Sequence, residues 1–305
     1  QLAARKSVAA IAREIESGPR LNRVLGPATL TSIGLGSMIG SGIFVLTGTV
    51  AANHTGPAVT LAFLVAAIGC GLAAICYAEL AAMIPVSGSA YSYTYATLGE
   101  GVAWFVGWNL ALEYMMSAAT VAVGWSGYVV NLLEELGVHL PAALTSAPVG
   151  KTAGHSLAAT GAIVNLPAVL IVAALTWICY RGIRESASMN NVMVIIKVAI
   201  IVLFIVAGLA FVDTSNWHPY LPANNGEFGH FGWSGVMMGA AIIYFAYIGF
   251  DTAATTAQEA RDPQRDVPAG ILGALVISTV LYVAMAAVMT GMVSYEKLDV
   301  AAPVA

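Results

Sequence analysis

The sequence predicts an all-α polytopic membrane protein, and two observations carry this prediction. Hydrophobic residues make up 59% of the 305 residues and charged residues only 9%. Soluble domains are about 45–50% apolar and about 25% charged, so most of the surface of this protein must face lipid. The apolar residues also gather into seven windows, each with the roughly 20 residues needed to cross about 30 Å of hydrocarbon.

The seven windows follow the chain in order, separated by more polar stretches. They are residues 28–52, 57–84, 102–133, 161–180, 191–212, 235–257 and 268–293. The third window is longer than a bilayer requires, which predicts a tilted helix or one that extends beyond the membrane. Residues 1–27 carry charges of both signs and no signal-peptide core, so we expect a cytoplasmic amphipathic segment there.

The basic residues predict how these windows are oriented. If the windows alternate in direction, nine of the twelve Lys and Arg residues fall on one side of the membrane and two on the other. The nine are Arg5, Lys6, Arg13, Arg20, Arg23, Arg181, Arg184, Arg261 and Arg265, and the two are Lys151 and Lys297. Because cytoplasmic loops are enriched in Lys and Arg, the N-terminus is expected to be cytoplasmic.

Several classes of function find little support. The net charge of −4 comes without a basic stripe, which argues against nucleic-acid binding. Cys70, Cys76 and Cys179 are odd in number and lie in apolar stretches, and the five histidines form no H-x-x-x-H pair, so neither a disulfide framework nor a metal site is expected. The chain lacks H-E-x-x-H and G-x-S-x-G, so we expect no enzyme and no cofactor.

The first window contains a dense glycine pattern. Residues 33–44 read IGLGSMIGSGIF, with four glycines in nine positions, and each glycine costs about 1 kcal/mol relative to alanine inside a helix. The spacing is wrong for a dinucleotide-binding loop. Two interpretations stay open: close helix packing through Gly36 and Gly40, or a helix interrupted at residues 40–42. An interruption would expose backbone N–H groups suited to a carboxylate.

The sixth window carries a related signal. Residues 244–251 read YFAYIGFD, with Gly249 and an acid, Asp251, in the middle of an apolar segment. In transporters built from two inverted five-span repeats, spans one and six correspond and both are interrupted at the substrate site. Carbonyls of Phe245, Ala246 and Ile248 would then accept hydrogen bonds from an ammonium group. With an anion pocket at residues 40–42, such a site suits the α-groups of an amino acid.

Four charged residues fall in or near the windows, where an ionised side chain costs about 2.5–3.5 kcal/mol at mid-membrane. Glu79 is expected to reach the cytoplasmic interface. Lys197 either snorkels to that interface or is a buried amine that takes up and releases a proton. Glu113 has three open roles: an ion pair with Lys197, a hydrogen bond to Ser41, or contact with a basic substrate. Asp251 is expected to have a structural role, capping or stabilising the half-helix that follows it, or else to touch substrate.

With these residues in view, the chain resembles the amino acid–polyamine–organocation transporters, most of all their cationic amino acid transporter branch and its bacterial homologues. The likeness runs from about residue 21 to residue 305. Four segments carry it: residues 40–44 (GSGIF), 85–91 (PVSGSAY), 245–251 (FAYIGFD) and 259–268 (EARDPQRDVP). The last of these is the most specific.

The resemblance implies a LeuT-like inverted-repeat fold. Residues 28–212 would form the first five-span repeat and residues 235–305 the first two spans of the second, so we expect a chain truncated after about seven spans. Spans one and six would be discontinuous. The resemblance also implies an α-carboxylate held at Gly40, Ser41 and Gly42. The α-amine would be held at the carbonyls of Ile39, Phe245, Ala246 and Ile248.

Lys197 matches the span-five lysine of proton-coupled relatives, which implies coupling to a proton gradient. The sequence thus favours an importer of amino acids, including cationic ones such as arginine and lysine, in a bacterial inner membrane, with lipid as its surroundings. One alternative is an exchanger of amino acids or polyamines. Another, from a different class, is a membrane scaffold or sensor that binds amino acids without moving them.

Overall fold

The structure is a computed structural model that describes residues 23–151, 157–181, 183–300 and 303–304. The predicted N-terminal amphipathic segment therefore lies almost wholly outside the described residues. Regular structure within the described part is helical, apart from a two-stranded antiparallel hairpin that pairs Val149 with Ala159. Its strands are β1 (Val149–Lys151) and β2 (Leu157–Ala159).

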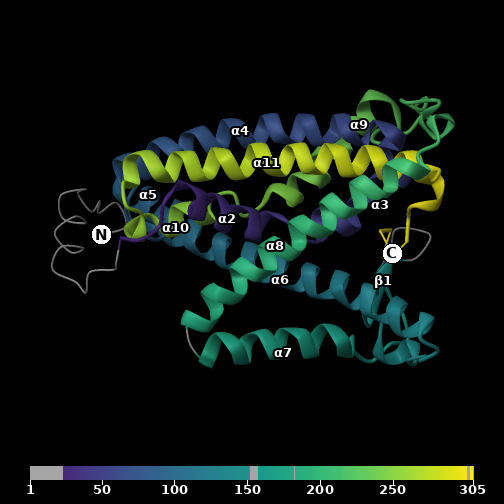
Figure 1. The fold of residues 1–305 in the computed structure, drawn as a ribbon, viewed down its shortest axis with the longest axis horizontal. Helices are drawn as coiled ribbons and strands as arrows, with labels where there is room; N and C mark the ends of the chain where they lie inside the picture. Colours follow the sequence, from purple (N-terminus) through teal and green to yellow (C-terminus); the bar gives the residue numbers. More distant parts are fainter. Residues whose placement is uncertain (1–22, 152–156, 182, 301–302, 305) are drawn as a thin grey trace.

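Long apolar helices alternate along the chain with short helices, single helical turns and irregular connections (Figure 1). The α-helices are α2 (Pro27–Met38), α3 (Thr47–Val50), α4 (Val59–Met83), α5 (Ser89–Thr97), α6 (Glu100–Glu135), α7 (Leu166–Arg181), α8 (Ile183–Gly208), α9 (Gly232–Ile243), α10 (Thr252–Thr255) and α11 (Pro263–Met292). The π-helical turns are η1 (Gly42–Leu46) and η2 (Ala51–Thr55). The 3-10 turns are η3 (Gly56–Ala58), η4 (Ala142–Leu144), η5 (Leu209–Phe211), η6 (Thr214–Trp217), η7 (Tyr244–Tyr247), η8 (Ala257–Glu259) and η9 (Tyr295–Lys297).

Five helical stretches of the described chain are long and apolar enough to cross a membrane. They are Gly42–Met83, Glu100–Glu135, Asn191–Phe211, Gly232–Thr255 and Pro263–Met292. The difference from the seven predicted windows has two sources. The first of these stretches joins the outer part of window one to window two, and α7 in window four is shorter, with its apolar part at Leu166–Tyr180. The protein is an integral, polytopic membrane protein whose described part is mainly helical.

The core forms where α11 packs along α4 and α2 (Figure 1). Small residues allow the helix axes to approach closely. A Cβ atom on Gly34 would lie 2.7 Å from Ala274 Cβ, and one on Gly270 would lie 2.6 Å from Leu30 Cβ. Without a strong hydrophobic drive inside lipid, such close backbone contact is what holds membrane helices together. The glycine-rich face of α2 thus serves packing as well as the interruption described below.

The outer helices present apolar side chains away from the core. On α6 and α8 large residues such as Trp104, Phe105, Ile195 and Leu203 are more than 60% exposed. In a soluble protein this surface would promote aggregation, whereas in a bilayer it faces lipid tails. The low charge content of the sequence is thus explained by these exposed apolar side chains, which face lipid and not water.

Hydrogen bonds between distant loops define the two ends of the molecule. At one end Leu25 N donates to Glu259 O at 3.0 Å and Arg261 N donates to Leu25 O at 2.9 Å. At the opposite end of α11, Asp213 N donates to Gly291 O at 2.9 Å. The backbone N–H of Ser215 also donates to the Asp213 carboxylate, which holds the pKa of this exposed group below its ordinary value. Loops that the charge pattern assigns to one side do lie together.

Candidate functional site

The first window is interrupted at its glycines. Helix α2 closes with Ile39 N donating to Leu35 O at 2.9 Å, and Ile39 then adopts an extended conformation with ψ 103°. A new helical run starts at Gly42, with Ile43 N and Phe44 N both donating to Gly40 O. The N–H groups of Ser41 and Gly42 lie at the start of this run, where a helix offers no acceptor of its own. We call residues 39–42 the first break.

The sixth window is interrupted as well. Helix α9 ends at Ile243 and tightens into the 3-10 turn η7, after which Ile248 leaves the helical conformation with ψ 135°. Gly249 has φ +103°, a conformation that side chains other than glycine's rarely adopt. The chain becomes helical again at Thr252. We call residues 244–251 the second break.

The two breaks touch each other, although some 200 residues separate them. A Cβ atom on Gly42 would lie 2.4 Å from both Cα and Cβ of Ala246. One on Gly249 would lie 2.6 Å from Ser37 Cβ. Distances below 3.0 Å leave no room for a methyl group, so glycine is required at both positions. Backbone-to-backbone contact therefore brings together the N–H groups of one break and the carbonyls of the other.

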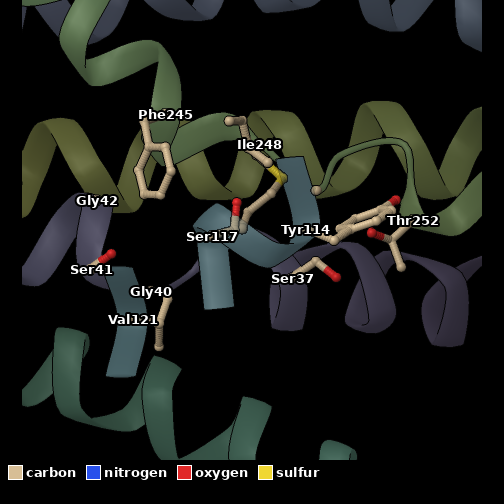
Figure 2. A pocket seen from close by; sticks show the side chains of 12 residues that line it. Ser37, Gly40, Ser41, Gly42, Tyr114, Ser117, Val121, Phe245, Ile248 and Thr252 are labelled. Atoms are coloured by element: carbon tan, nitrogen blue, oxygen red, sulfur yellow. The ribbon is translucent and has the colours of Figure 1, made fainter. Parts of the chain in front are cut away.

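A cavity of about 130 Å³ opens between the two breaks and α6 (Figure 2). Its wall is formed by Ser37, Met38, Gly40, Ser41, Gly42, Tyr114, Ser117, Val121, Phe245, Ile248, Gly249 and Thr252. One water molecule needs about 10–15 Å³ on the same measure, and pockets for drug-sized ligands begin near about 300 Å³. The space thus suits a small solute of a few heavy atoms.

Two hydroxyl groups of this wall, Ser41 Oγ and Ser117 Oγ, are buried and have no hydrogen-bond partner in the described structure. The hydroxyl of Thr252, by contrast, lies close to the Tyr114 side chain and interacts with it (Figure 2). Buried hydroxyls are paired in most proteins. The hydroxyls of Ser41 and Ser117 are therefore the candidates for pairing with a polar solute in the cavity.

Five residues predicted for the site line this cavity: Gly40, Ser41, Gly42, Phe245 and Ile248. Two others lie behind the wall. Ile39 is fully buried and Ala246 is 1% exposed. The carbonyl of Ala246 accepts a hydrogen bond from the Tyr282 hydroxyl at 3.2 Å.

The sequence pointed to Glu113 on α6, but not to the residues of this helix that line the wall. Tyr114, Ser117 and Val121 line the cavity from this helix. Their spacing of three and then four residues places them on one helix face. A serine on the same stripe as an aromatic residue, inside an apolar window, was the signal that could have identified this face.

The charged residues of the windows lie outside the cavity wall. Lys197 Nζ donates to Gly36 O at 3.0 Å, so α8 is tied to the last turn of α2. Glu113 is half-buried and forms no ion pair with Lys197 in the described part of the chain. Ser41 Oγ has no partner, so the predicted Glu113–Ser41 hydrogen bond is not formed either. Glu79 is exposed near the end of α4, where it was expected.

Asp251 stands at the N-cap position of α10, where its backbone carbonyl accepts a hydrogen bond from Ala254 N at 2.8 Å. Its side chain makes no cap hydrogen bond to α10. Instead Asp251 Oδ2 accepts a hydrogen bond from Ser89 Oγ at 2.8 Å, and both residues are buried. The carboxylate thus ties the second break to the N-terminus of α5. Among the described residues no group of three His, Cys, Asp or Glu side chains is placed to bind a metal.

Comparison with known proteins identifies the family. The family model for amino acid permeases matches residues 25–304. The chain is 48% identical over 284 residues to the methylthioribose transporter of Bacillus subtilis, covering 93% of this chain and 58% of that protein. It is 45% identical over 293 residues to the branched-chain amino acid permease of the same organism, covering 96% and 60%.

A more distant relative is the cationic amino acid transporter 4 of Homo sapiens, 38% identical over 279 residues, which cover 92% of this chain and 42% of that protein. The chain thus spans about half the length of the curated relatives it matches. These relatives are named as transporters or permeases and not as enzymes, in agreement with the prediction from the sequence. The chain belongs to the amino acid permease family.

Proposed function

We propose that this protein is a secondary transporter that moves a small amino acid across the membrane, and that the cavity between the two breaks is its binding site. The observation that carries the proposal is the contact between the breaks. The N–H groups of Ser41 and Gly42, at the positive end of a half-helix dipole, suit an α-carboxylate. Carbonyls of the second break, at Phe245 and Ile248, suit an α-ammonium group.

A neutral amino acid fits this site better than a cationic one. The cavity wall contains no charged side chain, and Glu113 is not part of it. Met38, Val121, Phe245 and Ile248 provide apolar surface. A branched-chain amino acid permease is among the relatives, which agrees with an apolar side chain. Arginine or lysine, the substrates suggested by the sequence resemblance, would have to reach Glu113 beyond the wall.

A second candidate substrate is a neutral polyol such as methylthioribose. The relative named as a methylthioribose transporter supports it, since that protein is 48% identical to this chain. The two unpaired hydroxyls of Ser41 and Ser117 would bind ribose hydroxyls as readily as an amino acid. The two substrates differ in one respect: only the amino acid needs both a carboxylate and an ammonium site.

We propose that a proton gradient drives transport through Lys197. Its ammonium group contacts Gly36 O in the last turn of α2, at the negative end of that half-helix. A charged amine is held there more strongly than a neutral one. Loss of the proton would loosen α8 from α2 and let the two parts of the first window move relative to each other.

We further propose an inverted-repeat architecture and a location in a bacterial inner membrane for this protein. Residues 28–212 would form one five-span repeat and residues 235–305 the start of its inverted partner. The two breaks would then be equivalent positions of the two repeats. The bacterial relatives and the distribution of Lys and Arg favour a bacterial inner membrane with the N-terminus in the cytoplasm.

Uptake by the intact gene product in liposomes tests the proposal. Labelled leucine, alanine, arginine and methylthioribose are supplied outside, with and without an inward proton gradient. We expect leucine or alanine to accumulate about tenfold per unit of pH difference, because one proton moving down one pH unit releases about 1.4 kcal/mol. Uptake that requires internal substrate would indicate an exchanger, and binding without flux a scaffold or sensor. No uptake of any amino acid would refute amino acid transport.

Replacing Lys197 by Met tests the coupling. We expect the variant to bind substrate and to equilibrate it, but not to accumulate it against a gradient, because it no longer carries a proton. Lys297→Met is the matched control, since Lys297 is exposed outside the helices that form the site. Gradient-driven accumulation that survives in Lys197→Met would remove Lys197 from the mechanism.

A further inference from the structure

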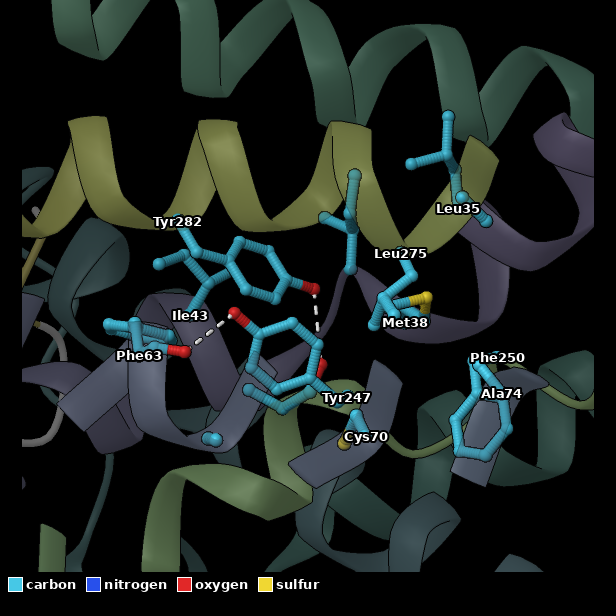
Figure 3. Packing of buried hydrophobic residues seen from close by; sticks show 14 of the residues in the cluster. Leu35, Met38, Ile43, Phe63, Cys70, Ala74, Tyr247, Phe250, Leu275 and Tyr282 are labelled. Carbon is cyan, nitrogen blue, oxygen red and sulfur yellow. Dashed lines mark hydrogen bonds between the residues drawn. The ribbon is translucent and has the colours of Figure 1, made fainter. Parts of the chain in front are cut away.

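A tyrosine on α11 makes a hydrogen bond directly to the second break. Tyr282 is fully buried, and its hydroxyl donates to the carbonyl of Ala246 at 3.2 Å (Figure 3). Neither residue lines the cavity. The contact comes from a helix that takes no part in the cavity wall.

The acceptor of this bond is a carbonyl that the break deprives of its usual partner. In a continuous α-helix Ala246 O would accept from the N–H of Phe250, four residues on. Here Phe250 N donates to Tyr247 O instead, at 3.4 Å. Gly249, with φ +103°, turns the chain away between them. The Tyr282 hydroxyl therefore replaces the hydrogen bond that unwinding removes.

The ring of Tyr282 belongs to a buried aromatic cluster formed with Phe63 and Tyr247. The ring centroid of Tyr282 lies 5.6 Å from that of Phe63 and 5.5 Å from that of Tyr247. Tyr247 in turn donates its hydroxyl to Phe63 O of α4, at 3.2 Å (Figure 3). Two neighbouring residues of the break are thus clamped, one to α11 and one to α4.

The position of Ala246 matters because the first break rests on it. Gly42 approaches Ala246 so closely that even a methyl group does not fit between them. A shift of Ala246 would change the distance between the N–H groups of the first break and the carbonyls of the second. A displacement of about 1 Å in such a site can cost on the order of a hundredfold in activity.

We propose that Tyr282 is a positioning residue, which keeps the second break unwound and sets its distance from the first by holding the carbonyl of Ala246. The inference rests on the proposed function, because it takes the cavity between the breaks as the substrate site. It also assigns the Ala246 carbonyl to the scaffold. The ammonium group of the substrate is then left to the carbonyl of Ile248 and to that of Phe245, which also accepts a hydrogen bond from Ile248 N at 3.2 Å.

Tyr282→Phe and Tyr247→Phe form a matched pair for testing this role. Each removes one buried hydroxyl from the same aromatic cluster. The acceptor lost by Tyr247, Phe63 O, lies inside the uninterrupted helix α4 and keeps its helical donor. Among the described residues, no second donor pairs with the acceptor lost by Tyr282. We expect the substrate Kd of the intact, purified protein to rise about five- to tenfold in Tyr282→Phe and by a clearly smaller factor in Tyr247→Phe.

Hydrogen–deuterium exchange of the same proteins without substrate provides an independent measurement. In Tyr282→Phe we expect faster exchange in peptides covering residues 244–252 than in Tyr247→Phe, with similar exchange elsewhere. If both variants exchange alike, or if Tyr282→Phe lowers only the melting temperature and leaves the Kd unchanged, the positioning role is refuted. A wild-type protein that binds no amino acid would refute the proposed function instead, and the exchange comparison would still decide the role of Tyr282.

Discussion

Gly42 is the residue on which the contact between the two breaks depends most directly. An added Cβ atom would meet backbone at 2.4 Å, and backbone cannot rotate aside as a flexible side chain can. Gly40, two positions earlier, differs in this respect: its added Cβ atom would meet only a methyl group of Val121, at 3.4 Å. The four glycines of the first window therefore serve different purposes.

Replacing Gly42 by Ala is expected to push the two breaks apart. Overpacking costs about 1–3 kcal/mol, so we expect substrate affinity to fall by at least about tenfold and the melting temperature to decrease. Gly69→Ala is the control, because Gly69 is exposed on α4 with no atom near its added Cβ, and this variant should be at least as stable as the wild type. Unchanged affinity in Gly42→Ala would show that the breaks do not need to touch.

Among the elements, α5 and the second break are joined by a single buried hydrogen bond. Ser89 begins α5 and has φ +48°, directly after Gly88 with φ +126°. This turn aims the Ser89 hydroxyl at Asp251 across 2.8 Å. Because Asp251 is 6% exposed, the loss of this donor leaves a buried carboxylate poorly satisfied.

Ser89→Ala is therefore expected to destabilise the protein by about 1–2 kcal/mol, the range of hydrogen bonds between membrane helices. A thermal-melting series in detergent measures this effect. The control is Ser92→Ala on the same helix, whose hydroxyl bonds only the Ser87 carbonyl at an exposed site. Equal melting temperatures for the two variants would mean that the Ser89–Asp251 bond contributes no stability.

For the molecule as a whole, the arrangement of the loops agrees with alternating spans. Residues near Leu25 and Ala260 pair at one end of the helix bundle, and Asp213 and Trp217 contact the far end of α11. The positive-inside rule assigns the first of these ends to the cytoplasm, because Arg23, Arg261 and Arg265 lie there in sequence.

Cysteine labelling of the whole protein tests this orientation. The three native cysteines are first replaced by serine, and a single cysteine is then introduced as Asn225→Cys or Gln264→Cys. In right-side-out vesicles we expect an impermeant maleimide to label the first variant and to reach the second only after permeabilisation. The reverse pattern would invert the proposed topology.

Local sequence determined the features that depend on backbone preference and on hydrophobicity. The low charge content and the long apolar windows identified a membrane protein, because a surface that faces lipid must be largely apolar. The glycines at positions 40, 42 and 249 predicted where the helices stop, since glycine adopts conformations that other residues avoid. Hydropathy also placed the boundary between windows one and two at residues 53–56, and Gly56, with φ +61°, turns the chain there.

Only the tertiary structure decided which groups these breaks bring together and which groups they leave free. Lys197 contacts Gly36 and not Glu113, the Asp251 side chain contacts Ser89 and not its own helix, and Tyr282 takes the Ala246 carbonyl that the sequence had assigned to substrate. Each of these pairs lies far apart in the chain, so its geometry follows from helix packing. Backbone conformation is a local property that sequence can predict, whereas the partner of a buried polar group is set by the neighbours that the fold places beside it.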